Sequence, residues 1–258
     1  MIDLVLPAVR RWRADHSAPL LVVGIAGAQG SGKSTLARGL AASLEGEGIA
    51  TALLSLDDLY LTRAERRRLA RGVHPLLATR GVPGTHDMAL GLATIDALAR
   101  GEPAQLPRFD KGRDDRSPSA DWPRAAPHTQ VLLFEGWCVG ARPQPPELLA
   151  APVNALERDE DGDGRWRAFV NTALGDAYPA LWSRLDRLVF LAAPDWPTVK
   201  RWRQQQEAEL RQTVPGAMTE VEVARFVLHY ERLTRWMLAD QPHRADLVLA
   251  LDRDRDAA

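Results

Sequence analysis

The sequence predicts an α/β fold, a doubly wound parallel sheet with helices on both faces. Two observations carry this prediction. A short apolar run at residues 20–26 leads through a glycine-rich turn into a helix-forming run and then into a second apolar run at residues 49–56, which is the strand, helix, strand order of a parallel sheet. The 258 residues, 45% of them hydrophobic, supply enough apolar side chains for one full core, so we expect a single domain over residues 1–258.

A phosphate-binding loop joins the first of these strands to the helix. Residues 27–34 read Gly-Ala-Gln-Gly-Ser-Gly-Lys-Ser, a glycine, four residues and Gly-Lys-Ser, in the strand-to-helix context that this motif requires. Such glycines let backbone N–H groups surround a phosphate at the positive end of the following helix. Lys33 is expected to reach the β- and γ-phosphates and Ser34 to ligate Mg²⁺. The nucleotide-binding candidates in this loop are Gly27, Gln29, Gly30, Ser31, Gly32, Lys33, Ser34 and Thr35, and the fold class becomes that of a P-loop NTPase.

The composition excludes several classes of partner. With 33 Lys and Arg against 34 Asp and Glu, the net charge of -1 gives no reason to expect nucleic acid, and a small molecule fits better. The single cysteine, Cys138, excludes an internal disulfide and a cysteine-based zinc site. No apolar run approaches the roughly 20 residues that cross a bilayer, so we expect no membrane association and a cytoplasmic location.

The first half of the chain alternates regular and irregular segments. Residues 1–19 are expected to form an N-terminal helical extension. After the strand at 49–56 comes a basic helix at 63–71, whose run Arg66-Arg67-Arg68 we interpret as a solvated face. Residues 72–128 are rich in proline, glycine and charge, interrupted by a helix near 87–100. Irregular segments this long are usually functional or disordered, and we expect this one to bind the substrate.

The second half continues the alternation. Strands are expected at 130–134, 188–192 and 246–250, with a break at Pro215-Gly216 between helices at 195–211 and 219–239. The acidic run at 159–164 imitates the start of a calcium loop, but Val170 stands where the bidentate Glu belongs, so no calcium site is expected. Asp161 or Asp163 is instead expected to cap one long helix near 166–184.

The ends of the strands are where ligands bind in an open parallel sheet. Asp57 and Asp58 follow the second strand and Glu135 follows the third, so each is a candidate to bind Mg²⁺ or to accept a proton. Helix capping remains the alternative for the two aspartates, and a solvated strand end remains the alternative for Glu135.

The helix at 195–211 is a candidate lid. Its Arg201 and Arg203 are placed to close over a nucleotide and stabilise charge on the transferred phosphate. A plainer interpretation stays open, because Arg203 and Glu207 stand at the i, i+4 spacing of a surface ion pair.

Several segments together resemble one family. Residues 55–62 (Ser-Leu-Asp-Asp-Leu-Tyr-Leu-Thr), 80–87 (Arg-Gly-Val-Pro-Gly-Thr-His-Asp), 107–111 (Pro-Arg-Phe-Asp-Lys) and 134–137 (Phe-Glu-Gly-Trp), with the phosphate-binding loop, resemble the D-glycerate 3-kinase family. That family is related to uridine kinase, pantothenate kinase and phosphoribulokinase. The resemblance implies transfer of the ATP γ-phosphate to D-glycerate to give 3-phosphoglycerate, with ATP and Mg²⁺ as cofactors. The acidic segment at 157–163 departs from the family pattern and resembles an insert.

The resemblance also implies roles for particular residues. Asp57 matches the general base of related kinases and Glu135 the acidic residue near Mg²⁺, which makes Lys33, Asp57 and Arg203 the catalytic candidates; Asp58 stays open as an alternative base. A small carboxylate needs cationic or amide partners, which Arg80, His86, Arg108 and Lys111 supply. The full set of substrate-binding candidates is Asp58, Tyr60, Arg80, His86, Asp87, Arg108, Asp110 and Lys111.

Two alternative functions remain. A uridine or pantothenate kinase would share the loop, Asp57 and Glu135 but should need a larger, aromatic pocket. A non-catalytic nucleotide switch of the GTPase kind needs an Asn-Lys-x-Asp motif, which the sequence lacks. The oligomeric state, monomer or homodimer, is left open by the sequence.

Overall fold

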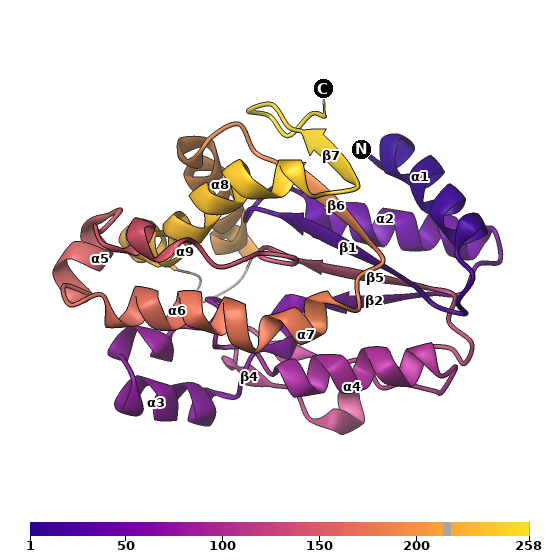
Figure 1. Ribbon diagram of the computed structural model, residues 1–258, viewed down its shortest axis with the longest axis horizontal. Coiled ribbons are helices and arrows are strands. Elements are labelled where there is room, and N and C mark those ends of the chain that lie inside the picture. The colour runs from indigo at the N-terminus through magenta and orange to yellow at the C-terminus, as the bar shows by residue number, and fades with distance from the viewer. Residues whose placement is uncertain (214–217, 258) are drawn as a thin grey trace.

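The predicted α/β fold is confirmed in the structure, a computed structural model that describes residues 1–213 and 218–257. Its centre is a parallel sheet of five strands in the order β2-β5-β1-β6-β7 (Figure 1). The strands are β1 (Leu21–Gly27), β2 (Thr51–Ser55), β5 (Val131–Gly136), β6 (Arg187–Ala192) and β7 (Leu247–Ala250). All five coincide with predicted strands to within a few residues. The predicted break at Pro215-Gly216 lies outside the described residues.

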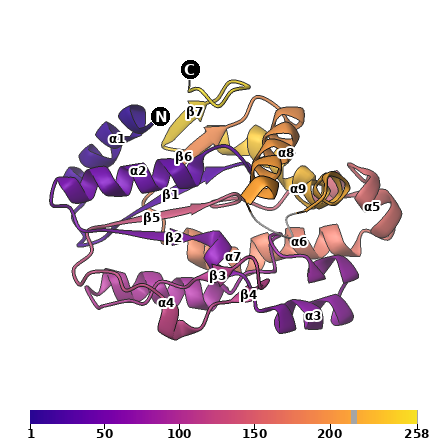
Figure 2. The ribbon, with the colours of Figure 1, turned by 180° about the vertical axis from the view of Figure 1, so that it is seen from behind.

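Helices cover both faces of the sheet. On one face lie α1 (Ile2–Asp15), α2 (Lys33–Gly46) and the start of α8 (Trp196–Thr213), and on the other lie α4 (Met88–Ala99), α6 (Arg165–Asp176), α7 (Tyr178–Trp182) and α9 (Glu220–Asp240) (Figures 1 and 2). Alternate side chains of β1 divide between two apolar clusters. Leu21, Val23 and Ile25 pack with the first set of helices, whereas Val22 and Ala26 pack with the second. This double burial explains why the strands read as continuous apolar runs.

The remaining elements connect the strands and helices already described. A short helix η1 (Leu56–Leu59) follows β2 directly, and α3 (Arg63–Gly72) and η2 (Pro75–Ala78) come next. After α4, a two-stranded hairpin, β3 (Phe109–Asp110) with β4 (Asp115–Arg116), and η3 (Ser119–Asp121) lead to β5. Beyond β5 lie η4 (Pro146–Leu149) and α5 (Ala155–Glu160), and η5 (Gln241–His243) precedes β7.

The interpretation of the basic run on α3 was wrong for its first residue. Arg67 and Arg68 are exposed, but the Arg66 side chain is only 1% exposed. The hairpin packs over it, and its guanidinium donates to the carbonyl oxygens of Leu61 and Ala78 and to Asp114. A run of like charges gave no sign that one of its members had buried partners.

The acidic segment at 157–163 is part of the packed structure. Glu157 and Asp161 are fully buried and form ion pairs with Arg232 and Arg167 at 2.6 and 2.9 Å. These partners lie in other elements, so the segment is tied to α9 and α6. Asp161 accepts hydrogen bonds from the backbone N–H groups of Trp166 and Arg167, which caps α6 as predicted.

The long helix predicted at 166–184 is divided in two. Helix α6 ends at Asp176, and α7 starts at Tyr178 with Pro179 in its first turn. A proline has no backbone N–H to donate to the preceding turn, so Pro179 weakens the continuation of the first helix. Tyr178, the first residue of α7, thereby comes to lie in the core beside His86.

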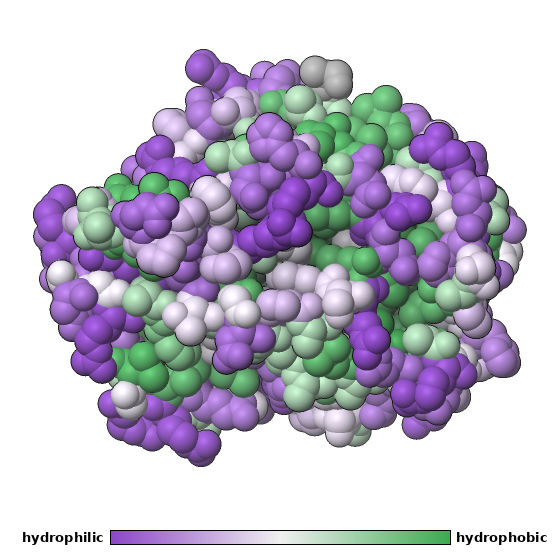
Figure 3. All heavy atoms as spheres, viewed as in Figure 1, coloured by the Kyte–Doolittle hydropathy of each residue, from purple (hydrophilic) through white to green (hydrophobic). Residues whose placement is uncertain are grey.

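The surface agrees with the balanced charge of the chain. Figure 3 shows hydrophilic side chains over much of one face, with apolar side chains in separate patches between them. Among the described residues, no helix is both long enough and apolar enough to span a bilayer.

Candidate active site

A cleft lies at the carboxyl ends of β1, β2 and β5, where the strand order places β1 between β5 and β6. It has a volume of about 180 Å³. Four cations and one carboxylate line it: Lys33, Arg80, Lys111, Arg203 and Asp57. The other lining residues are Gln29, Gly30, Ser34, Tyr60, Trp137, Gln206, Leu210, Phe226 and Tyr230. This excess of positive charge suits a ligand that carries several negative charges.

The glycine-rich loop has the backbone that phosphate binding requires. Gly30 and Gly32 have φ values of 78° and 87°, in the left-handed region that glycine adopts without strain. A Cβ on Gly30 would lie 2.7 Å from the Cβ of Trp202 on α8, so no larger residue fits between loop and helix. Lys33 forms no hydrogen bond or ion pair with any residue that the structure describes, and the buried hydroxyl of Ser31 has no partner there either. These groups fit a loop whose partner is a phosphate.

Ser34 and Glu135 are brought together beside this loop. The hydroxyls of Ser34 and Ser55 each donate to Oε1 of Glu135 at 2.9 Å. Glu135 lies inside β5 in register with Ser55 and is only 9% exposed, which rules out the alternative of a solvated strand end. A hydroxyl and a carboxylate at this spacing are the oxygen ligands that Mg²⁺ prefers, so the pair fits the predicted metal.

Asp57 presents its carboxylate to the cleft. Its Oδ1 accepts from the Tyr60 hydroxyl and its Oδ2 from the Lys111 ammonium, each at 2.6 Å. The helix-capping alternative does not hold, because Ser55 is the residue that caps η1 by accepting from the Asp57 N–H. Burial works to raise the pKa of Asp57, but Lys111, the Tyr60 hydroxyl and Lys33 outweigh it and hold this pKa well below the usual range of a carboxyl group. Asp57 is therefore ionised at neutral pH.

Asp58 points elsewhere and does not line the cleft. Its carboxylate accepts from the backbone N–H of Phe109 at 3.0 Å and from Arg108 at 3.3 Å. Burial raises the pKa of Asp58 despite these two donors. Of the two candidate bases, only Asp57 faces the P-loop lysine.

His86 is not the cationic ligand that we expected. Its ring is 5% exposed, and its Nδ1 lies 2.5 Å from the Tyr178 hydroxyl. Burial lowers the pKa of His86 to about 3, so the ring is neutral at physiological pH. Its position behind Tyr60, with the two ring centroids 4.9 Å apart, gives it a packing role.

Three further substrate-binding candidates are engaged in structural contacts. Asp87 caps α4 by accepting from the Leu90 N–H and pairs with Arg116. Asp110 accepts from the N–H groups of Gly112 and Arg113 and so closes the turn of the hairpin. Arg108, paired with Asp58, does not line the cleft. The cations on the acceptor side are therefore Arg80 and Lys111, without Arg108.

The two candidate arginines of α8, Arg201 and Arg203, differ in position. Arg203 lines the cleft, pairs with Glu207 at 2.6 Å and lies 5.7 Å from the ring centroid of Phe226. Arg201 donates to the carbonyl oxygen of Arg253 and lies outside the cleft, so its expected contact with the nucleotide has no support in the geometry.

Five lining residues had no role in the sequence prediction: Trp137, Gln206, Leu210, Phe226 and Tyr230. Trp137 stood inside a family motif, and Phe226 and Tyr230 follow the i, i+4 spacing of one helix face, which was the available signal. Tyr230 donates its hydroxyl to the carbonyl oxygen of Arg80 at 2.9 Å, which links α9 to the acceptor side.

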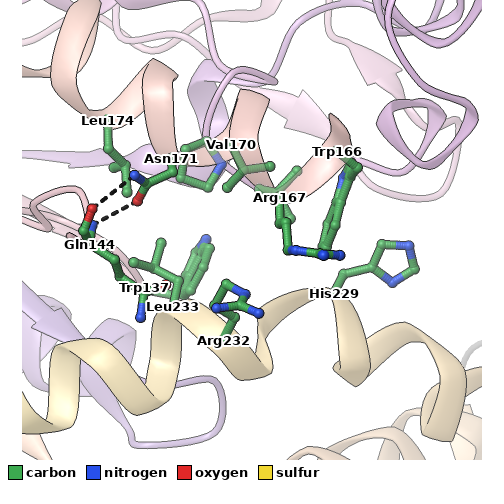
Figure 4. Close-up of a pocket in the computed structure, with 12 residues that line it drawn as sticks. Trp137, Gln144, Trp166, Arg167, Val170, Asn171, Leu174, His229, Arg232 and Leu233 are labelled. Carbon is green, nitrogen blue, oxygen red and sulfur yellow. Dashed lines mark hydrogen bonds between the residues drawn. The ribbon is translucent and has the colours of Figure 1, made fainter. Parts of the chain in front are cut away.

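A second, much smaller cavity lies between α6 and α9 (Figure 4). Its volume of about 20 Å³ is that of a single water site. Gln144 and Asn171 close one side by two mutual hydrogen bonds of 2.7 and 3.0 Å, and the arginines that line it are already paired. Nearby, His74, Asp161 and Asp163 lie within 4.8 Å of one another, but Asp161 is engaged by Arg167 and the start of α6. The cleft beside the P-loop, with its four cations and Asp57, is therefore the candidate active site.

Comparisons with known proteins agree with this geometry. No protein-family model matches the chain. The chain is 35% identical over 240 residues to the uncharacterized kinase mug58 of Schizosaccharomyces pombe, with 89% of this chain and 85% of that protein covered. It is 33% identical over 264 residues to the chloroplastic D-glycerate 3-kinase of Arabidopsis thaliana, with 95% of this chain but only 55% of that longer protein covered.

A solved structure matches over the whole length. The D-glycerate 3-kinase of Cryptococcus neoformans superposes with a TM-score of 0.78 at 28% identity, covering 100% of this chain and 96% of that one. The sequence relationships and the shared fold agree with the phosphate-binding loop and the cleft beside it. The chain therefore belongs to the family of P-loop kinases, ATP-dependent phosphotransferases, that includes D-glycerate 3-kinase.

Proposed function

We propose that this kinase transfers the γ-phosphate of ATP to D-glycerate and produces 3-phosphoglycerate. One observation carries the choice of acceptor: Lys111 and Arg80 line the same cleft as Asp57 and the P-loop lysine, and Lys111 donates to the Asp57 carboxylate. Two cations can hold a small carboxylate by charge-assisted hydrogen bonds, and the carboxylate beside them can receive a hydroxyl. Two relatives named D-glycerate 3-kinase support the same substrate.

The roles of the residues follow from their positions. Lys33 and the N–H groups of the P-loop bind the β- and γ-phosphates. Ser34 and Glu135 would hold Mg²⁺, which when bound neutralises charge on the phosphates. Arg80 and Lys111 bind the glycerate carboxylate and direct its 3-hydroxyl toward the γ-phosphate. Asp57 accepts the hydroxyl proton while the new P–O bond forms and the bond to ADP breaks.

Arg203 completes the site from α8. It stabilises charge on the transferred phosphate, with Glu207 holding its guanidinium in place. The first turns of α8 are anchored, because Trp196, Val199 and Trp202 belong to the core. We therefore limit the lid role to the part of α8 that follows Trp202, which includes Arg203 and Gln206.

A nucleoside kinase is the second candidate. Tyr60, Trp137, Phe226 and Tyr230 give the cleft aromatic walls, which is the property expected for a nucleoside acceptor. Uridine is uncharged, however, and would form no charge-assisted hydrogen bond to the donors that Arg80 and Lys111 present to the cleft. This difference favours the carboxylate.

A substrate panel tests the proposal. Purified protein with ATP and Mg²⁺ is offered D-glycerate, uridine, pantothenate and ribulose 5-phosphate, and ADP release is followed together with ³¹P NMR of the product. The proposal expects turnover with D-glycerate and a phosphate ester at its 3-position. Turnover with uridine alone would contradict the proposal and identify the protein as a nucleoside kinase.

A further inference from the structure

The buried Arg66 and the cleft residue Arg80 share one carboxylate. Asp114 accepts from the guanidinium of Arg66 at its Oδ2, at 2.6 Å, and from that of Arg80 at its Oδ1. Both guanidinium groups also stack on Phe109, with their central carbons 5.5 and 5.6 Å from the ring centroid. The group of two guanidinium ions and one carboxylate has a net charge of about +1, so Asp114 does not cancel the positive charge that Arg80 presents to the cleft.

The two arginines are committed to different degrees. Arg66 donates from all three of its guanidinium nitrogens, to the carbonyl oxygens of Leu61, Ala78 and Asp114 and to the Asp114 carboxylate. Arg80 uses only its Nη1, and its side chain makes no other hydrogen bond to a residue in the described part of the chain. The remaining donors of Arg80 are therefore available to a ligand in the cleft.

The same carboxylate fixes the turn that carries Lys111. Residues 111–114 connect β3 to β4. Asp114 has a φ of 53°, a left-handed backbone conformation that residues other than glycine rarely adopt without support. The bonds from Arg66 to both the carbonyl and the carboxylate of Asp114 supply that support. At the other end of this turn, Lys111 reaches Asp57.

We propose that Arg66 and Asp114 are positioning residues for acceptor binding: through Asp114, the buried Arg66 holds both the cleft guanidinium of Arg80 and the hairpin turn that brings Lys111 to Asp57. This inference rests on the proposed function and names residues that touch neither substrate nor nucleotide. The P-loop, Ser34 and Glu135 lie outside this network. Loss of the network should therefore weaken acceptor binding and spare nucleotide binding.

The variants follow from this division. Arg66→Met keeps most of the side-chain volume and removes the donors. Arg67→Met is the matched control, since Arg67 is the exposed neighbour on the same helix. Asp114→Asn removes the shared charge from the other side, and the double variant tests whether the two act through one link.

The expected kinetics separate positioning from general destabilisation. In Arg66→Met and in Asp114→Asn we expect the KM for D-glycerate to rise about tenfold or more while the KM for ATP stays within about twofold. The double variant should be no worse than the poorer single variant, because one network is lost only once. Arg66→Lys should rescue little, since an ammonium cannot reach all four acceptors. A parallel rise of both KM values, or an unchanged KM for D-glycerate, would overturn the positioning role.

A second measurement does not depend on the acceptor. Amide hydrogen exchange of peptides covering 109–116 should be faster in Arg66→Met than in wild type and unchanged in Arg67→Met. Equal exchange in Arg66→Met and wild type would contradict the proposed support of the hairpin. Wild-type activity on D-glycerate is the reference that separates the two claims. Its absence contradicts the proposed function, whereas normal wild-type activity with an unaffected Arg66→Met variant contradicts the positioning role alone.

Discussion

The ammonium of Lys111 lies 2.6 Å from Oδ2 of Asp57. A cation proposed to bind the acceptor is thus paired with the carboxylate that is proposed to accept its proton. The two residues are 54 positions apart in the chain. Because Lys111 lowers the pKa of Asp57, the pH range in which Asp57 is ionised depends on Lys111.

Replacing Lys111 should move the acidic limb of the pH profile upward. Proton acceptance requires ionised Asp57, so activity is lost as the pH falls through the pKa of this group. In the wild type Lys111 holds that pKa well below the usual range, so Asp57 contributes no limb above about pH 4. In Lys111→Met only the Tyr60 hydroxyl and Lys33 still oppose the effect of burial, so the pKa of Asp57 rises and kcat/KM should begin to fall at a higher pH.

The measurement is kcat/KM between about pH 4 and 8, normalised within each variant so that the loss of the ammonium as a substrate ligand drops out. Lys111→Arg keeps a positive charge near Asp57 and should therefore give the same acidic side of the pH profile as the wild type. Identical limbs in Lys111→Met and wild type would argue against ionic control of Asp57.

Asp57→Asn should lower kcat by about 10² or more with little change in the KM for ATP, because a general base acts mainly in the transition state. Asp58→Asn is the comparison, since the Asp58 carboxylate holds Phe109 and Arg108 rather than facing the cleft. It should affect kcat much less. A collapse of ATP affinity in Asp57→Asn would make Asp57 chiefly a metal ligand.

Lys33→Ala should abolish phosphoryl transfer and leave the fold intact. The Lys33 ammonium makes no ion pair with the described residues, so its removal costs no packing or pairing in the folded protein. Circular dichroism and thermal unfolding would report the fold, and ATP turnover the activity. Wild-type turnover in this variant would mean that the P-loop does not bind the transferred phosphate.

Replacing Glu157 should destabilise the protein without touching the site. Glu157 is fully buried, accepts from Arg232 and caps the Val153 N–H, so Glu157→Gln leaves a buried guanidinium unpaired. We expect a loss of about 3 kcal/mol in the free energy of unfolding. Glu160→Gln, which breaks the exposed pair with Arg225, should change it by no more than about 0.5 kcal/mol. Equal losses of unfolding free energy for the two variants in urea titrations would show that the burial of the ion pair does not determine its contribution to stability.

The elements that the sequence predicted best are those specified by local pattern. The strands and the P-loop were predictable because continuous apolar runs and Gly-x-x-x-x-Gly-Lys-Ser each fix a local structure. The position after the second strand indicated Asp57, and the motifs of the resemblance contain Arg80 and Lys111; the three lie together in the cleft.

What could not be predicted depends on partners far away in the chain. Arg66 was interpreted as a surface charge because its partner Asp114 lies 48 residues away in the chain. Nothing near Glu157 in the sequence indicated its pairing with Arg232, which lies 75 residues away. His86 and Arg108 belong to the same motifs as Arg80 and Lys111, and only the fold shows that Tyr178 and Asp58 engage them. Pattern identifies the residue types of a site, whereas tertiary contact decides which of them face it.

Replacing Arg80 should change the KM for D-glycerate but not the KM for ATP. Arg80→Ala is expected to raise the KM for D-glycerate by at least about tenfold, with little change in the KM for ATP, because it removes a charge-assisted hydrogen bond to the carboxylate. Arg108→Ala, which the sequence ranked beside it, should have a smaller effect, since Arg108 does not line the cleft. Initial rates at varied acceptor concentration measure both. A larger effect from Arg108 would relocate the carboxylate site.

The most direct test of the account compares D-glycerate with glycerol as acceptors. Glycerol keeps the hydroxyl groups and lacks only the carboxylate, so it isolates the contribution of Arg80 and Lys111. We predict a kcat/KM for glycerol that is lower by about 10³ or more, because glycerol lacks the carboxylate that forms charge-assisted hydrogen bonds with both cations. Comparable values of kcat/KM for the two acceptors would contradict the central claim that this cleft selects its substrate by its carboxylate.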